Sequence, residues 1–181
     1  MATPFRPALV LLQQYARYHR DRRNILTHLV GVPMIVFGLC VLLSRPEFRL
    51  AGLLLTPLWL VLAVSAAWYL SRGHLGVGLA TTLGVGMLAA LAYRVGGGAT
   101  SNWLAWGLSF FGIGWIIQFV GHYYEGKKPA FADDLVGLWV GPMFVVMELL
   151  APLGLFKGLI AQVEAQAGPT YLRDLAHSAA R

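Results

Sequence analysis

The sequence predicts an all-α protein, a polytopic membrane helix bundle with four to five transmembrane helices and an N-terminal amphipathic interfacial helix. Of its 181 residues, 57% are hydrophobic and only 12% are charged, against about 25% charged residues in an ordinary soluble domain. Too few polar side chains are present to cover a water-soluble globule. The apolar residues also form long runs separated by short polar breaks, which is typical of membrane helices. We interpret residues 1–181 as one integral membrane domain.

The first segment, residues 7–22, is expected to form the amphipathic helix at the membrane interface. Apolar side chains such as Leu11, Leu12 and Tyr15 alternate there with Gln13 and Gln14. A basic cluster then precedes the first long apolar run, and it consists of Arg17, Arg20, Arg22 and Arg23. Such a cluster is typical of a cytoplasmic flank that faces anionic lipid. The sequence shows no RNA- or DNA-binding motif, so we expect no nucleic acid partner.

Five apolar segments follow, over residues 25–43, 50–70, 75–93, 103–121 and 135–150. They are too long for buried strands and lack period-two alternation, so we predict that they are helices. The fifth segment is shorter and is interrupted by Gly141 and Pro142. It could span the membrane or re-enter it, which gives either five or four spans. The tail, residues 157–181, is expected to form a surface helix or to fray.

Alternating spans predict that several histidines lie near one membrane face, on the cytoplasmic side together with the N-terminus. His28 begins the first apolar segment, His74 begins the third and His122 ends the fourth, while His19 lies just outside. A lone histidine at a membrane boundary is usually an interfacial polar group. As a group, two or three neutral imidazoles with a carboxylate or water suit iron, zinc or copper. The chain has no HExxH motif and no cysteine pair, so spacing does not name the metal.

The distance between His19 and His28 requires a break in the chain if both bind one ion. Nine residues place two side chains on opposite faces of a straight helix, roughly 13 Å apart along its axis. The sequence between them, "RDRRN", is a plausible turn, because Asp21 and Asn24 are both residue types that cap helices. Asn24 would cap a helix that begins at Ile25.

Several other polar residues are candidates for the same site. Asn24, Gln118 and Glu125 lie at the predicted level of the histidines. Glu148 lies inside the fifth apolar segment, where a carboxylate is costly; it could act in the site or tie helices together by hydrogen bonds. Lys127 and Lys128 could anchor the chain at the cytoplasmic face or pair with a fatty-acid carboxylate.

Three stretches of the sequence resemble the Mpo1-like family. "YARYHRDRRNILTHLVGVPM" is similar to the opening Y-x3-H-x4-N-x3-H-x2-G-x-P of that family, and "WIIQFVGHYYEGKKPAF" resembles its second motif. "GPMFVVMELL" resembles the closing segment. The resemblance spans about residues 12 to 152, most of the chain.

The resemblance implies an iron(II)-dependent dioxygenase that removes one carbon from 2-hydroxy fatty acids, in fatty acid α-oxidation and sphingoid base degradation. The expected partners are a 2-hydroxy fatty acid, dioxygen and membrane lipid. The implied location is the cell inner membrane if the protein is bacterial and the endoplasmic reticulum if it is eukaryotic. His19, His28 and His122 match the motifs as Fe²⁺-binding and catalytic candidates, with Asn24, Gln118 and Glu125 as supporting or additional ligands. Glu148 is a further candidate of this kind because of its place in an apolar segment. His74 falls outside the motifs.

Two alternatives remain open from the residues alone. The protein could be a non-enzymatic membrane scaffold or small transporter whose histidines are interfacial hydrogen-bonding groups. It could also be another metal-dependent lipid enzyme, such as a hydroxylase or a hydrolase. The sequence predicts no oligomeric state.

Overall fold

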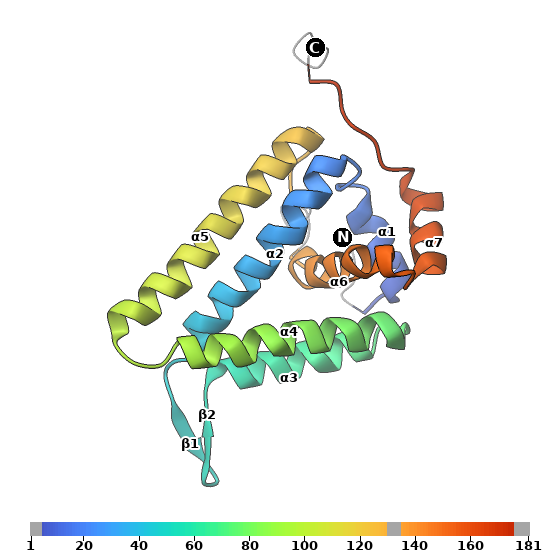
Figure 1. The fold of residues 1–181 in the computed structure, drawn as a ribbon. Helices are drawn as coiled ribbons and strands as arrows, with labels where there is room; N and C mark the ends of the chain where they lie inside the picture. Colours follow the sequence, from blue (N-terminus) through green and yellow to red (C-terminus); the bar gives the residue numbers. More distant parts are fainter. Residues whose placement is uncertain (1–4, 130–134, 176–181) are drawn as a thin grey trace.

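The computed structural model of the protein describes residues 5–129 and 135–175, and helices dominate it (Figure 1). This confirms the predicted all-α class. The elements are α1 (Ala8–Ala16), α2 (Arg22–Leu43), β1 (Phe48–Leu50), β2 (Leu53–Leu55), α3 (Pro57–Leu70), α4 (Leu75–Val95), α5 (Thr100–Glu125), α6 (Gly137–Leu150), the 3₁₀ turn η2 (Ala151–Leu153) and α7 (Lys157–Ala167). The end of the predicted tail, residues 176–181, lies outside the described residues.

Three helices of the described chain, α2, α4 and α5, are long and apolar enough to cross a membrane. The helices α3 and α6 are apolar but have 14 residues each. At 1.5 Å per residue they are shorter than a hydrocarbon core about 30 Å thick. The number of spans therefore stays a prediction. The predicted interruption of the fifth segment is wrong, because α6 runs through Gly141 and Pro142, both buried against neighbouring helices.

The second apolar segment is only partly helical. It was expected to be a helix over 50–70, but its first residues pair with the preceding ones in a β-hairpin, with Phe48 opposite Leu55 and Leu50 opposite Leu53. Gly52 adopts a φ of 82° at the tip, a conformation that glycine accommodates without strain. The helix α3 then begins at Pro57, whose fixed φ suits the first turn of a helix. The hairpin projects away from the bundle (Figure 1).

The antiparallel pair α2 and α5 forms the long axis of the bundle. Its two helices approach closely because glycines face backbone every seven residues. A Cβ at Gly38 would lie 2.5 Å from the Phe111 amide nitrogen, and a Cβ at Gly114 would lie 2.9 Å from the Gly31 carbonyl oxygen. The same register brings Gly121 opposite Asn24. This close approach places His28 of α2 beside the His122 end of α5.

The remaining helices close the bundle around this pair. The apolar side of the predicted amphipathic helix, α1, is covered by protein, since Leu11 and Leu12 are buried in one cluster with Phe144 of α6 and Val163 of α7. The helices α3 and α4 run side by side across the opposite end of α2 (Figure 1). The turn between them is tied to α1, because the Ala8 amide donates to the Arg72 carbonyl at 2.7 Å.

Candidate metal centre

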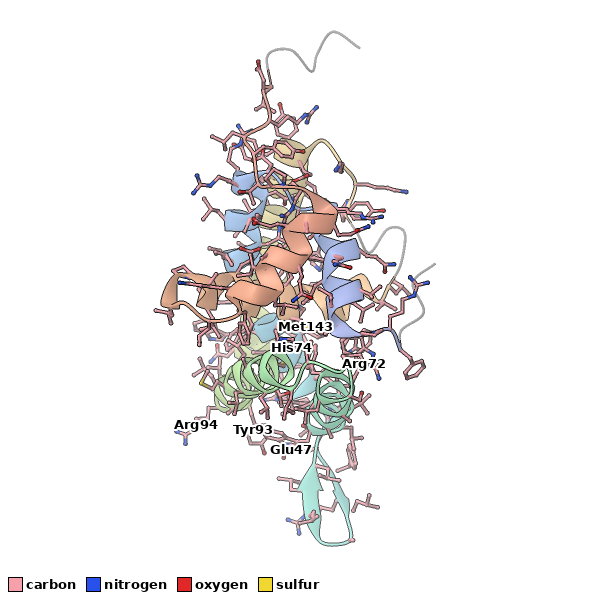
Figure 2. All side chains as sticks on the ribbon, turned by 90° about the vertical axis from the view of Figure 1, so that its right-hand side faces the viewer. Glu47, Arg72, His74, Tyr93, Arg94 and Met143 are labelled. Carbon is pink, nitrogen blue, oxygen red and sulfur yellow. The ribbon has the colours of Figure 1, made fainter. Side chains whose placement is uncertain are left out.

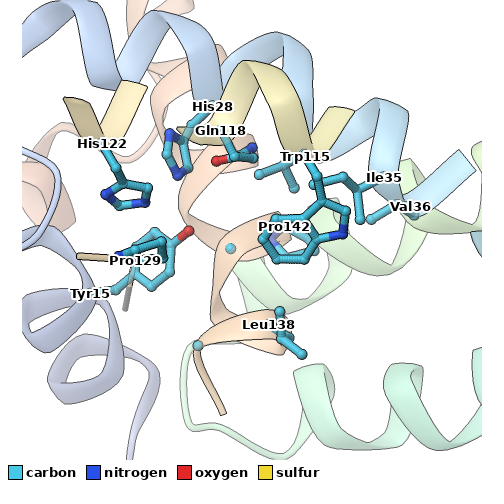
Figure 3. Close-up of a pocket in the computed structure, with 13 residues that line it drawn as sticks. Tyr15, His28, Ile35, Val36, Trp115, Gln118, His122, Pro129, Leu138 and Pro142 are labelled. Carbon is cyan, nitrogen blue, oxygen red and sulfur yellow. The ribbon is translucent and has the colours of Figure 1, made fainter. Parts of the chain in front are cut away.

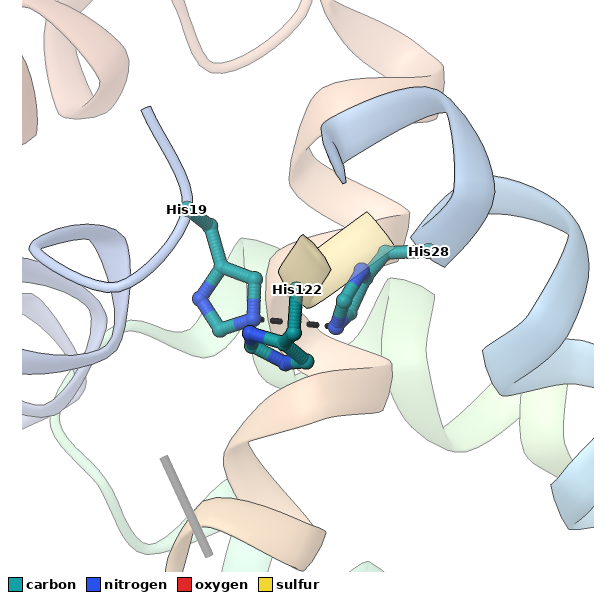
Figure 4. A group of neighbouring side chains, drawn as sticks. All are labelled: His19, His28 and His122. Atoms are coloured by element: carbon teal, nitrogen blue, oxygen red, sulfur yellow. Dashed lines mark hydrogen bonds between the residues drawn. The ribbon is translucent and has the colours of Figure 1, made fainter. Parts of the chain in front are cut away.

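Three buried histidines from three parts of the chain meet at one end of the α2–α5 pair. His19 lies in the turn between α1 and α2, His28 on the first turns of α2, and His122 near the end of α5. One ring nitrogen from each lies within 4.8 Å of the others, a geometry that could hold a metal ion (Figure 4). The Nε2 atoms of His19 and His28 are 2.9 Å apart.

The hydrogen bonds of two of these rings fix where their protons are. The Nδ1 atom of His19 lies 2.7 Å from the Tyr15 carbonyl oxygen, and that of His28 lies 2.8 Å from the Asn24 carbonyl oxygen. A carbonyl oxygen only accepts, so each Nδ1 must carry the proton. In the neutral rings the two Nε2 atoms then face each other as two lone pairs, and neither can donate to the other. A cation between them would satisfy both.

Protonation of His19 is disfavoured, so a proton does not readily take the place of that cation. Burial lowers the pKa of His19 well below its usual value, and the charges that His28 and His122 would carry lower it further. His19 is therefore neutral at physiological pH, which is the form of imidazole that binds metals. In addition, the buried Nδ1 of His122 has no hydrogen-bond partner within the described part of the chain.

The turn that carries His19 ends at Asp21, the residue that caps the N-terminus of α2. The predicted break is present but lies earlier than expected: α1 ends at Ala16 and α2 begins at Arg22. The cap is Asp21, whose carboxylate accepts from the Arg23 amide at 2.9 Å, and the expectation that Asn24 caps a helix starting at Ile25 is wrong. Burial alone would raise the pKa of Asp21, but hydrogen bonds from Arg23 and from the Arg173 amide lower it to about 2.

Glu125 and Asn24 hold this turn against the end of α5. The Oε2 atom of Glu125 accepts from the backbone amides of Arg20 at 2.9 Å and Asp21 at 2.8 Å. The Asn24 Nδ2 atom donates to the same oxygen at 3.2 Å and to the Tyr18 carbonyl at 3.0 Å. Glu125 follows His122 by three residues, so its carboxylate lies on the same side of α5. These contacts place His19 opposite His122.

A small cavity opens beside the histidines, between α2, α5 and α6 (Figure 3). Its volume is about 60 Å³. Polar groups of Tyr15, His28, Gln118 and His122 lie at one side, and the rest of the wall is mainly apolar, with Val32, Ile35, Val36, Trp115, Pro129, Leu138 and Pro142. The buried Nε2 of Gln118 has no hydrogen-bond partner among the described residues. The cavity therefore suits the polar head of an amphipathic molecule.

The other predicted site residues lie outside the histidine group. Glu148 is half-buried on α6, and its charge interacts with those of Arg20 and Glu164. The Nζ atom of Lys127 donates to the Arg17 carbonyl at 2.7 Å and lies 3.9 Å from the Glu125 carboxylate. Lys128 is exposed.

His74, which was expected at the same membrane level, is also separate from this group. It caps the N-terminus of α4, where its Nδ1 accepts from the Val77 amide at 3.2 Å, and its ring contacts Phe156. Figure 2 shows His74 beside the green helices α3 and α4.

Two aromatic rings complete the surroundings of His19. Tyr15 stacks on the His19 ring with centroids 4.1 Å apart and an interplanar angle of 9°. Its hydroxyl points into the cavity (Figure 3). Phe144 of α6 covers His19 from another side, at 5.6 Å. The spacing of four residues between Tyr15 and His19 indicates the first contact, whereas no sequence signal indicates the second.

The chain is similar to known proteins over most of its length. A family model described as "2-hydroxy-palmitic acid dioxygenase Mpo1-like" matches residues 6–153, which include all three histidines and the cavity. The chain is also 33% identical over 153 residues to the 2-hydroxy-palmitic acid dioxygenase MPO1 of Saccharomyces cerevisiae, with 83% of each chain covered. No solved structure matches. The extent of the family match and this identity show that the chain belongs to the Mpo1-like family.

Proposed function

We propose that this protein is an iron(II)-dependent dioxygenase that shortens 2-hydroxy fatty acids by one carbon. The observation that carries the proposal is the pair of unprotonated Nε2 atoms of His19 and His28, which face each other at 2.9 Å in a buried site beside His122. Burying such groups without a partner is costly, so the site is built for a cation. The name of the yeast relative supplies the substrate class and the reaction type.

The donor set fits iron(II). Three neutral imidazoles from His19, His28 and His122 would hold the ion, and nitrogen ligands of this kind suit iron as well as zinc or copper. When bound, iron(II) with open coordination positions supplies the redox chemistry that activates dioxygen. The protein fixes the orientation of two of the imidazoles through the carbonyl groups of Tyr15 and Asn24.

The cavity positions the substrate head. The Gln118 amide and the Tyr15 hydroxyl would bind the carboxylate and the 2-hydroxyl group, since both side chains line the cavity beside His28 and His122. A volume of about 60 Å³ has no room for a long acyl chain. The chain would therefore leave along the apolar wall of Trp115 and Leu138 toward lipid.

The reaction balances without an outside reductant. A 2-hydroxy acid and one dioxygen give the acid one carbon shorter, carbon dioxide and water. The bond between C1 and C2 breaks, the substrate loses four electrons and dioxygen accepts them. The residues around the histidines need only to bind and orient the head group and to exclude bulk water.

The charge distribution supports a location for the site at the cytoplasmic face. Arg17, Arg22 and Arg23 flank the start of α2, and Lys127 and Lys128 follow the end of α5. By the positive-inside tendency, this end of the bundle would face the cytoplasm. A fatty acid in that leaflet would then meet the histidines with its polar head.

A single-turnover experiment tests the function. The purified protein is loaded anaerobically with iron(II), mixed with 2-hydroxypalmitic acid and exposed to oxygen, and the products are identified by mass spectrometry. We expect the fifteen-carbon acid in the wild type and in the His74→Ala control, and none in His122→Ala. Tight iron binding with a hydroxylated or hydrolysed product would identify a different lipid enzyme. A folded protein that retains no iron and is indifferent to chelators would support the non-enzymatic alternative.

A further inference from the structure

The chain beyond the family match returns to the metal centre. The match ends at residue 153, and α7 (Lys157–Ala167) packs on α1, where Leu159 and Val163 join the buried cluster that contains Leu11 and Leu12. After α7 the chain continues toward the C-terminus (Figure 1). Residues 168–173 of this stretch, which we name the C-terminal strap, lie beside the turn that carries His19.

The strap pairs with that turn through its backbone. The Tyr171 amide donates to the Arg20 carbonyl at 2.9 Å, and the Arg22 amide donates to the Tyr171 carbonyl at 2.9 Å. These two bonds form a parallel bridge between Asp21 and Tyr171. They hold the turn at Arg20 and Arg22, on both sides of Asp21 and one and three residues after His19.

Side chains reinforce the pairing. The Arg173 amide donates to the Asp21 carboxylate at 2.8 Å, and the Arg23 guanidinium donates to the Arg173 carbonyl at 2.7 Å. The Arg20 guanidinium donates to the Gly168 carbonyl at 3.0 Å. The Asp21 carboxylate is thus shared between the cap of α2 and the strap. The Asp21 side chain is fully buried, so its carboxylate is shielded from water, and the three hydrogen bonds between the strap and the turn are partly buried.

We propose that the C-terminal strap positions His19 for metal binding, with Tyr171 and Arg173 acting as positioning residues through their backbone groups. The inference rests on the proposed metal centre. His28 and His122 sit on long helices that pack through glycines, whereas His19 sits on a five-residue turn between α1 and α2. Such a turn is the least constrained of the three supports. The strap and Glu125 together restrict it, Glu125 from the side of α5 and the strap from the opposite end of the chain.

Two matched truncations test this inference by metal affinity, measured with anaerobic iron(II) titration of the purified protein in detergent. A chain ending at Ala167 keeps α7 and loses the strap, and a chain ending at Leu175 keeps both. We expect the shorter chain to bind iron about 10- to 100-fold more weakly, the usual cost of losing groups that orient a ligand, while the longer one matches the wild type. Equal affinity in the two truncated chains would overturn the proposal.

A proline pair covers the case in which the shorter chain does not fold. Tyr171→Pro removes the amide that donates to the Arg20 carbonyl, whereas Thr170→Pro places the same ring one residue earlier, where the amide donates to no backbone carbonyl of the described chain. We expect weaker iron binding by about tenfold only for Tyr171→Pro, with thermal unfolding of the metal-free forms within a few degrees of each other. Equal binding by the two variants would refute the strap's role. A wild type that binds no iron would instead refute the proposed function.

Discussion

The two ends of the α2–α5 pair are built on different principles. At the end that carries His28 and His122, the interior is polar, and three of the five buried side-chain atoms without a hydrogen-bond partner in the described residues lie there, on Asn24, Gln118 and His122. At the opposite end the interior is an apolar cluster that includes Phe37, Val41 and Leu58. One polar group there is satisfied locally, since the Trp103 indole donates to the Val41 carbonyl at 2.6 Å, whereas the buried hydroxyl of Thr56, two residues before Leu58, has no partner among the described residues.

This difference separates stability from function within one pair of helices. Close packing of apolar side chains stabilises a fold without needing a ligand. Buried polar groups without partners cost free energy, and proteins retain them where a ligand supplies the missing interaction. The apolar end therefore stabilises the helix pair, whereas the unpartnered polar groups at the histidine end lower the free energy of unfolding and form a binding site. Variants at the histidine end should lower iron affinity with little change in the free energy of unfolding, and variants at the apolar end should do the reverse.

Removing a histidine should have the largest effect on metal binding. We expect His28→Ala to weaken iron(II) binding by more than about 100-fold, because the remaining two imidazoles lose the partner that faces His19. The metal-free protein should remain folded, since the change also removes a buried repulsion between two lone pairs. Anaerobic titration measures the affinity, with His74→Ala as the control. Unchanged affinity in His28→Ala would remove His28 from the site.

A cavity at the apolar end should have the opposite signature. Leu58 is 1% exposed, and Leu58→Ala should lower the free energy of unfolding by about 2–5 kcal/mol. Iron affinity should stay within about twofold of the wild type, because Leu58 belongs to the apolar cluster with Phe37 and Val41 at the other end of the helix pair. Denaturant unfolding in detergent measures the first quantity, with the exposed Leu60→Ala as the control. A large loss of iron affinity in Leu58→Ala would show that the two ends are not separable.

A methyl group between the helices at the histidine end should have a smaller effect. A Cβ at Gly121 would lie 2.5 Å from the Asn24 Oδ1 atom and would also overlap the Thr27 side chain. Gly121→Ala should push α5 away from α2 near the histidines and weaken iron binding about tenfold. Gly112→Ala is the matched control, since open space surrounds that position. Equal iron affinities for the two variants would contradict the close approach at Gly121.

The pH dependence of stability should be the smallest signal. Burial holds the pKa of His19 well below 6.5 in the folded chain, so the unfolded chain binds more protons as the pH falls below about 6.5. The contribution of His19 is full above that value, and it is lost toward lower pH by at most about 1.4 kcal/mol per pH unit. Unfolding of the metal-free protein at pH 7.5, 6.5 and 5.5 measures the slope. We expect a shallower slope in His19→Gln than in the wild type; identical slopes in the two proteins would contradict a neutral, buried His19.

Hydropathy predicts most of the helices but not the details that depend on tertiary contacts. The long runs that became α2, α4 and α5 are visible in the sequence because lipid-facing helices are apolar on all sides. The hairpin before α3 is not, since Phe48, Leu50 and Leu53 are as apolar as helix residues. The choice of Asp21 over Asn24 as the cap depends on Arg23 and Arg173, which the local sequence alone does not specify.

The candidate site shows the same division. Alternating spans predict one membrane level for His19, His28, His74 and His122, and the family resemblance selects His19, His28 and His122. The structure brings these three together. His74 was expected at the same level, but position along the membrane normal says nothing about position around the bundle. The roles of Phe144 and of the C-terminal strap come from chain segments that are distant in sequence and carry no motif. Metal binding by the three histidines stays a prediction.

X-ray absorption at the iron edge tests iron binding by the three histidines most directly. The wild-type protein is loaded anaerobically with one iron(II) per chain and measured in detergent. The histidine site predicts nitrogen or oxygen ligands at about 2.0–2.2 Å together with the multiple scattering of about three imidazole rings, and a loss of one ring in His28→Ala. Iron surrounded by oxygen ligands alone, with no imidazole scattering, would contradict iron binding by the histidines.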